Sequence, residues 1–280
     1  MKSRILTALV GIPIIIAFIW FSHTPALLVF TGFLTAASLL ELARCAGLEK
    51  KLYAILPLEA AALSTILMTR LASSHERFFV FTFMIFFILL LYLASAAVFS
   101  RGHLKITESA YLHFTGLYVT FGFASMVLVR DRPYGQYAFV LCMLVPWISD
   151  SFAYFGGRLF GKHKLIPDIS PKKTVEGAVC GVVFGTLSIV LYGFVIGLIF
   201  DAQPNYSALI AVGAAMTVIS QCGDLIASCI KRHFGVKDYG RILPGHGGIM
   251  DRFDSIIVTS PIVYMLCTLS PVFEIFIDRV

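Results

Sequence analysis

The run from Phe78 to Phe99 reads FFVFTFMIFFILLLYLASAAVF and contains no charged side chain. An α-helix rises about 1.5 Å per residue, so a run of this length can cross a hydrocarbon core of roughly 30 Å. Eight further apolar stretches resemble it: 5–21, 25–46, 52–69, 111–128, 137–155, 177–200, 206–230 and 253–272. The chain is 58% hydrophobic and only 14% charged. We therefore predict an all-α, polytopic integral membrane protein with about nine transmembrane helices.

The positive charges predict an orientation. With nine spans and a cytoplasmic N-terminus, 17 Lys and Arg side chains fall on the cytoplasmic side and 5 on the other, which accounts for all 22. Such an excess is typical of cytoplasmic loops and explains the net charge of +6. It predicts location in the inner (cytoplasmic) membrane, with the polar loops 158–176 and 231–252 facing the cytoplasm. No DNA- or RNA-binding motif is present, so nucleic acid is not an expected partner.

The chemistry is unevenly distributed along the chain. Residues 1–135 are expected to form structural transmembrane helices, and residues 136–280 a catalytic transmembrane region. In the first part, Glu41 and Arg44 lie three residues apart near the end of the second span. We interpret them as an interfacial ion pair rather than a site.

The stretch from Ser228 to Asp254 reads SCIKRHFGVKDYGRILPGHGGIMDRFD and lies between the last two expected spans. Its Lys and Arg side chains can neutralise phosphates, and its carboxylates can hold a hard cation. Its glycines let backbone N–H groups approach a ligand closely. These three features together are what phosphoryl or nucleotidyl transfer needs. Basic residues alone would suit an ordinary cytoplasmic loop, but Asp251 and Asp254, directly before a span, favour a functional site.

This stretch resembles the signature of the phosphatidate cytidylyltransferases, also called CDP-diacylglycerol synthases. Every fixed position of that signature is met: Ser228, Lys231, Arg232, Lys237, Asp238, Gly240, Pro244, His246, Gly247, Gly248, Asp251, Arg252 and Asp254. A second similar stretch, SDSFAYFGGRLFGKHKLIPDISPKKTVEG, runs from Ser149 to Gly177. The resemblance covers the C-terminal half closely and the first half only through its hydrophobic layout.

Asp150 lies deep in the sixth expected span, and Tyr154 and Arg158 follow at i+4 and i+8 on the same helix face. A carboxylate inside a membrane segment is costly and usually lines a cavity or finds a partner. A structural pairing among these side chains is one interpretation. The other, which we favour, is that this face borders a polar site, with Gly156 and Gly157 allowing close helix packing.

Lys172 and Lys173 precede the seventh span, and either Ser170 or Thr174 is expected to cap that helix. Glu176 in its first turn would favour the helix N-terminus. The two lysines are also explained by the excess of positive charge in cytoplasmic loops. The resemblance implies that this loop contacts a nucleotide or lipid phosphate.

The eighth span carries a polar row at helical spacing. Its members are Ser220, Gln221, Asp224, Ser228 and Lys231. A membrane helix must turn such a row towards protein or a wet cavity. We expect Asp224 to approach Asp251 at the cytoplasmic ends of neighbouring helices. Because two close carboxylates repel each other unless a cation lies between them, this pair predicts a Mg²⁺ site.

These patterns give a set of candidate site residues. We expect catalytic roles for Asp224, Asp251, Lys231, Arg232 and His246, with Asp224 and Asp251 as metal ligands. We expect substrate or phosphate binding by Lys172, Lys173, Lys237, Arg252, Gly247, Gly248, Ser228 and Asp150.

The resemblance implies that CTP and phosphatidate react to give CDP-diacylglycerol and pyrophosphate in phospholipid biosynthesis. It also implies Mg²⁺, a second cation such as K⁺, membrane lipid as the surroundings, and a homodimer as one arrangement. Two alternatives remain open at this point. One is a transporter that uses intramembrane carboxylates, and the other is a different CTP-dependent lipid enzyme, such as a polyprenol kinase.

Overall fold

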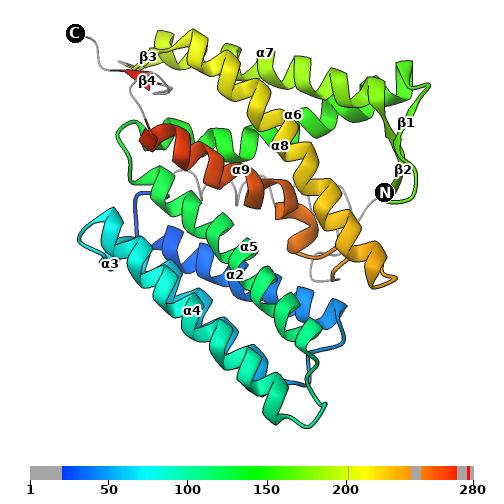
Figure 1. The fold of residues 1–280 in the computed structure, drawn as a ribbon. Helices are drawn as coiled ribbons and strands as arrows, with labels where there is room; N and C mark the ends of the chain where they lie inside the picture. Colours follow the sequence, from blue (N-terminus) through cyan, green and yellow to red (C-terminus); the bar gives the residue numbers. More distant parts are fainter. Residues whose placement is uncertain (1–20, 201, 241–246, 270–275, 278–280) are drawn as a thin grey trace. The chain divides into compact units, whose positions relative to one another are not determined.

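The computed structural model describes residues 21–200, 202–240, 247–269 and 276–277. This part of the chain is mainly helical, as Figure 1 shows. Its helices are α2 (Ala26–Cys45), α3 (Leu52–Leu71), α4 (His75–Phe99), α5 (Ile106–Arg130), α6 (Gly135–Phe160), α7 (Val175–Ile199), α8 (Tyr206–His233) and α9 (Met250–Leu269). Eight of the nine expected spans correspond to these helices. The first, 5–21, lies outside the described residues except for its last position.

Seven of the described helices, α2 to α8, are long and apolar enough to cross a membrane. Their outward faces carry large apolar side chains, such as Phe83 and Ile88 on α4, which are 68% and 59% exposed. A soluble protein rarely exposes so much apolar surface, so the predicted helical, polytopic membrane protein is confirmed. α9 is a helix where the ninth span is expected, but it is not among the seven, and its first turns hold Asp251, Arg252 and Asp254.

The chain forms two compact units. The first comprises residues 1–127 and 234–253, and the second comprises residues 128–233 and 254–280. The expected division at residue 135, between structural and catalytic helices, stays a prediction. The segment 234–253, which holds much of the signature, groups with the N-terminal helices rather than with the C-terminal ones. α9 runs across the second boundary, so its Asp251 and Asp254 belong to different units.

In the second unit, glycines bring α6, α7 and α8 close together. A Cβ atom added at Gly156 on α6 would lie 2.6 Å from the Sγ atom of Cys180 on α7. A Cβ at Gly181 on α7 would lie 2.7 Å from Gln221 Nε2 on α8 and 3.0 Å from the Ser149 carbonyl oxygen on α6. Small residues permit such close approach between membrane helices. The role in close packing expected for Gly156 is therefore confirmed.

Two short β-pairs add to the helices. Strands β1 (Lys164–Ile166) and β2 (Ser170–Thr174) form an antiparallel hairpin between α6 and α7, where a loop was expected. Strands β3 (Gln203–Pro204) and β4 (Phe276–Ile277) form the second antiparallel pair. The hairpin leads directly into α7, so its last residues are fixed relative to that helix.

Of the two expected candidates, Ser170 and Thr174, it is Thr174 that caps α7, because its Oγ1 atom accepts a hydrogen bond of 3.2 Å from the Gly177 amide. Glu176 accepts hydrogen bonds from the amides of Lys162 and His163, at the other end of the hairpin. Its Oε1 atom also lies 2.6 Å from His163 Nδ1. The two ends of the hairpin are thereby held together at the start of α7.

Candidate active site

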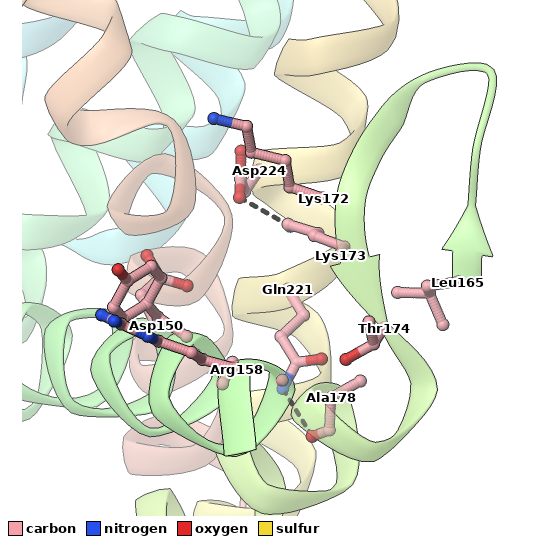
Figure 2. Close-up of a pocket in the computed structure, with 12 residues that line it drawn as sticks. Asp150, Arg158, Leu165, Lys172, Lys173, Thr174, Ala178, Gln221 and Asp224 are labelled. Carbon is pink, nitrogen blue, oxygen red and sulfur yellow. Dashed lines mark hydrogen bonds and ion pairs between the residues drawn. The ribbon is translucent and has the colours of Figure 1, made fainter. Parts of the chain in front are cut away.

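A cavity of about 540 Å³ opens in the second unit, among α6, α7, α8 and the hairpin. α6 contributes Asp150, Tyr154 and Arg158, so the three residues that share one helix face in the sequence do line one space. The rest of the wall is formed by Ala153 and Gly157 from α6, Leu165, Lys172, Lys173 and Thr174 from the hairpin, Ala178 from α7, and Gln221 and Asp224 from α8. The cavity therefore collects acidic and basic groups from the Ser149–Gly177 stretch and adds Asp224 from α8 (Figure 2).

Asp224 and Lys173 form an ion pair in this cavity. The Lys173 Nζ atom lies 2.6 Å from Asp224 Oδ2, and each side chain is about a quarter exposed. Figure 2 shows Lys173 extending from β2 towards Asp224 on α8. The other carboxylate oxygen, Oδ1, accepts a hydrogen bond of 3.3 Å from Ser228 Oγ, one turn further along α8. The polar row predicted on α8 is thus turned inwards, with Asp224 at its centre.

Gln221 connects the three helices around the cavity. Its Nε2 atom donates to the Ala178 carbonyl oxygen on α7 at 3.1 Å and to Ser149 Oγ on α6 at 3.4 Å. The first of these bonds is drawn in Figure 2. Since the Gln221 side chain is held by both neighbouring helices, α8 is fixed in rotation and Asp224 is directed to the cavity.

Three carboxylates of the second unit lie within electrostatic range of one another. Asp254 on α9 interacts with the charges of Asp224, Asp150 and Lys231. Asp254 and Lys231 are both buried, each with 9% of the residue exposed. From the sequence, Asp254 was recognised only as a signature carboxylate directly before a span. The structure instead groups it with Asp224, which no spacing rule could indicate, because 30 positions of chain separate the two.

The carboxylates of this group are suitable ligands for a hard cation. Among the described residues, however, no three His, Cys, Asp or Glu side chains converge closely enough to hold a metal ion unaided. Mg²⁺ in phosphoryl-transfer sites commonly uses one or two carboxylates and takes its other ligands from waters and substrate phosphates. The residues present therefore fit Mg²⁺ that arrives with a nucleotide.

The basic residues of the signature differ in their surroundings. Lys231 is buried near the acidic group, whereas Arg232, at the end of α8, is exposed and its Nε atom donates to the Ile169 carbonyl oxygen of the hairpin at 3.3 Å. Lys237 and Arg252 are exposed. His246 lies outside the described residues, so its expected catalytic role remains a prediction.

The rest of the signature lies in the first unit. Asp251 Oδ2 accepts hydrogen bonds from the amides of Tyr239 and Gly248, at 2.8 and 2.9 Å. Burial raises the pKa of the Tyr239 phenol well above its ordinary value, so this side chain stays neutral at physiological pH. Asp251 belongs to the first compact unit and Asp224 to the second. The expected pairing of Asp251 with Asp224 around a metal therefore stays a prediction.

Gly247 and Gly248 were expected to present amides to a phosphate. Gly247 has a φ of 84°, a conformation that favours glycine. The Gly248 amide donates to Asp251 Oδ2, so in this structure it stabilises the loop before α9.

Glu41 on α2 is a contact of this loop that sequence reasoning missed. Its side chain is buried, and it accepts hydrogen bonds from the amides of Ile249 and Met250. The charge of Arg44 acts on this carboxylate, but the expected ion pair leaves out its contacts with the amides of Ile249 and Met250. The only signal in the sequence was a carboxylate at the end of an apolar span, and nothing linked it to a loop about 200 residues away.

The family of the chain follows from comparison with known proteins. A family model described as "Cytidylyltransferase family" matches residues 2–270. The chain belongs to the cytidylyltransferase family. Among curated relatives of this family, phosphatidate cytidylyltransferases of Staphylococcus haemolyticus, Staphylococcus epidermidis and Staphylococcus aureus are 42%, 41% and 39% identical to the chain.

These alignments extend over 175, 172 and 173 residues. They cover 61–62% of this chain and 64–65% of the length of each relative. The cytidylyltransferase model itself reaches almost from end to end, across both compact units.

Proposed function

We propose that this protein transfers the cytidylyl group of CTP to phosphatidate, giving CDP-diacylglycerol and pyrophosphate. The observation that carries the proposal is the cavity of the second unit, where Asp224, Lys173, Asp150 and Arg158 meet in a member of the cytidylyltransferase family. The similarity to curated phosphatidate cytidylyltransferases supports phosphatidate as the acceptor.

In the proposed reaction, a phosphate oxygen of phosphatidate attacks the α-phosphorus of CTP. The bond from that phosphorus to the oxygen that bridges the α- and β-phosphates breaks, and this oxygen leaves as part of pyrophosphate. The attacking oxygen is already ionised, so the reaction needs no side chain to remove a proton from it. The work of the protein is to position the two phosphates and offset their charge. Lys172 and Lys173 line the cavity and suit this task, and the buried Lys231 and the exposed Arg232, Lys237 and Arg252 are further candidates.

Mg²⁺ held by Asp224 and Asp251 would supply charge neutralisation for the triphosphate when bound. Asp254 is a further candidate ligand, because it lies within electrostatic range of Asp224. The same carboxylates suit the second cation, such as K⁺, that the family resemblance implies. In the free protein, Lys173 holds one oxygen of Asp224.

We further propose nine spans with the N-terminus and the active site on the cytoplasmic side, since CTP is a soluble cytoplasmic nucleotide. The excess of Lys and Arg in loops 158–176 and 231–252 supports this orientation. A lipid substrate must enter from the bilayer, and the cavity is bounded by three helices that could cross a membrane. The family resemblance also allows a homodimer, which a measurement of the protein's mass in detergent would detect.

One experiment tests the proposed reaction against its alternatives. Purified protein is incubated with Mg²⁺, phosphatidate and CTP labelled either in the cytidine ring or in the γ-phosphate. We expect only the ring label to become lipid-soluble, because the cytidylyl group is transferred whole. A CTP-dependent lipid kinase would move only the γ label into lipid. A transporter would move neither label, and either of these results would reject the proposal.

A further inference from the structure

Glu41 caps a helix that begins far away in the sequence. Its side chain lies at the end of α2 and is only 1% exposed. Its Oε1 atom accepts from the Ile249 amide at 3.0 Å, and its Oε2 atom accepts from the Met250 amide at 2.8 Å. The first amides of an α-helix have no acceptor within the helix, and a negative charge there is favoured by the helix dipole. The first turn of α9, which belongs to the first unit, therefore receives its N-terminal cap from α2.

The position of Glu41 explains two glycines of the signature. A Cβ atom at Gly248 would lie 2.5 Å from both carboxylate oxygens of Glu41, and a Cβ at Gly240 would also collide with Oε1. Neither glycine is among the described residues with a positive φ, in contrast to Gly247 at 84°. Their backbone would accept other residues, so it is the nearness of Glu41 that excludes a side chain at both positions.

Asp251 also binds the segment that leads into α9, residues 248–250, which we call the α9 turn. Its Oδ2 atom accepts from the Gly248 amide at 2.9 Å and from the Tyr239 amide at 2.8 Å. Two carboxylates thus hold consecutive amides: Asp251 that of Gly248, and Glu41 those of Ile249 and Met250. The direction of the Asp251 carboxylate depends on where this turn lies, and Glu41 fixes the turn.

We propose that Glu41 is a positioning residue for cytidylyl transfer, which sets the start of α9 and thereby aims Asp251. This inference rests on the proposed function, in which Asp251 helps to hold the metal. Groups that orient metal ligands commonly change activity or metal affinity by about 10- to 100-fold when they are replaced. Glu41 would act through Asp251 and would touch neither substrate.

Glu41→Gln is the sharpest variant, because a carboxamide keeps the size of the side chain and offers only one oxygen. Its NH₂ group must then face a backbone N–H, and a flip of the amide only exchanges which bond is lost. Glu41→Ala removes both bonds. Gly248→Ala leaves Glu41 in the chain but displaces its carboxylate. Glu49→Gln is the matched control, because Glu49 is exposed just beyond the same helix.

The first measurement is hydrogen exchange of the segment 247–251, which requires no catalytic activity. We expect exchange of these amides to rise on the order of tenfold or more in Glu41→Gln, since one charge-assisted bond is lost. Exchange elsewhere and exchange in Glu49→Gln should not change. Unchanged protection of 247–251 in Glu41→Gln would overturn the proposal, whether or not the wild-type protein makes a lipid-soluble cytidine product.

The second measurement is kinetic and is made per folded protein. We expect kcat to fall roughly 10- to 100-fold and the Mg²⁺ midpoint to rise, with the KM for CTP nearly constant. A purely structural role would lower the yield of folded protein and leave kcat and the Mg²⁺ midpoint as they are. A wild-type protein that forms no cytidine lipid would refute the proposed function, and the exchange measurement would still decide whether Glu41 fixes the turn.

A double variant tests the steric part of the inference. Gly248→Ala alone should reduce kcat, because its methyl group pushes the Glu41 carboxylate away. In a Glu41→Ala background that carboxylate is gone, so Gly248→Ala should add less than about a twofold further loss. Full additivity of the two losses would overturn the claim that Gly248 is required by Glu41.

Discussion

Asp224→Asn separates the two roles that the cavity gives to this carboxylate. The wild-type side chain pairs with Lys173 at 2.6 Å through Oδ2 and accepts from Ser228 Oγ through Oδ1. Asparagine keeps the size of the side chain and an oxygen for Ser228, but it has no charge for Lys173 or for a metal ion. If Asp224 serves only to hold Lys173, stability should suffer most. If it holds Mg²⁺ with a nucleotide, activity should suffer most.

The expected loss of stability is small. Unit charges 2.6 Å apart attract by about 6 kcal/mol at an effective dielectric constant of about 20, and by about 1.6 kcal/mol in water. Both side chains are about a quarter exposed, so desolvation and screening offset most of this attraction. We expect a net loss of about 1–2 kcal/mol. That loss lowers Tm by a few degrees, at roughly 2–4 °C per kcal/mol for a chain of this class.

The expected loss of activity is larger. A metal ligand at a phosphoryl-transfer site contributes several kcal/mol of charge stabilisation. With about 1.36 kcal/mol per factor of ten, a loss of about 3–4 kcal/mol lowers the rate by roughly 10²- to 10³-fold. We therefore expect Asp224→Asn to remain folded in detergent, to lose two to three orders of magnitude in kcat (about 10²–10³) and to need more Mg²⁺ for its residual activity. Asp168→Asn, at an exposed hairpin position, is the matched control.

The assay follows lipid-soluble cytidine at varied Mg²⁺ concentration, together with thermal unfolding of each variant. The double variant Asp224→Asn with Lys173→Met completes the test. A methionine in place of Lys173 should recover much of the lost stability, because it leaves no unpaired charge, yet activity should stay low. Recovery of activity in the double variant, or a normal Mg²⁺ response in Asp224→Asn, would refute the metal assignment.

Two further predictions concern the hairpin. Lys172→Met should raise the KM for a phosphate-bearing substrate roughly tenfold, with a smaller effect on kcat. Steady-state kinetics would measure this change, with Lys50→Met as the control. An unchanged KM would assign Lys172 to the lipid surface. A single cysteine in place of Asp168, in a background without the native cysteines, should react with a membrane-impermeant maleimide only from the cytoplasmic side. Reaction from the opposite side would reject the proposed orientation.

The membrane helices could be predicted from the sequence because length and apolarity are local properties. α3 begins at Leu52, as expected, and α7 and α8 begin within two residues of the expected positions. The hairpin was missed because its strands, Lys164–Ile166 and Ser170–Thr174, are shorter than any reliable alternation of polar and apolar residues. The cap of α7 was narrowed to Ser170 or Thr174, since capping depends only on neighbouring residues, and the structure selects Thr174.

The candidate site could be predicted only in part, because only its local contacts are encoded in the spacing of residues. Asp150, Tyr154 and Arg158 share a face because helical geometry requires it, and the structure brings them to one cavity. The ion pair between Lys173 and Asp224 joins a strand to a helix 51 positions later, and no periodicity encodes that contact. Glu41 is the extreme case, because its partners are 208 and 209 positions away. Tertiary packing decides such contacts.

The two faces of α7 impose different evolutionary constraints. Its buried face contains Gly177, Gly181 and Gly185, where an added methyl group would meet the backbone or side chains of α6 or α8. Its opposite face exposes Leu187 and Leu191, where any apolar side chain of similar size would serve a lipid environment equally well. Mutations should therefore accumulate along one side of this helix and be purged from the other. Among distant homologues, α7 should therefore keep glycine at these buried positions, while the apolar residues on its exposed face vary almost freely.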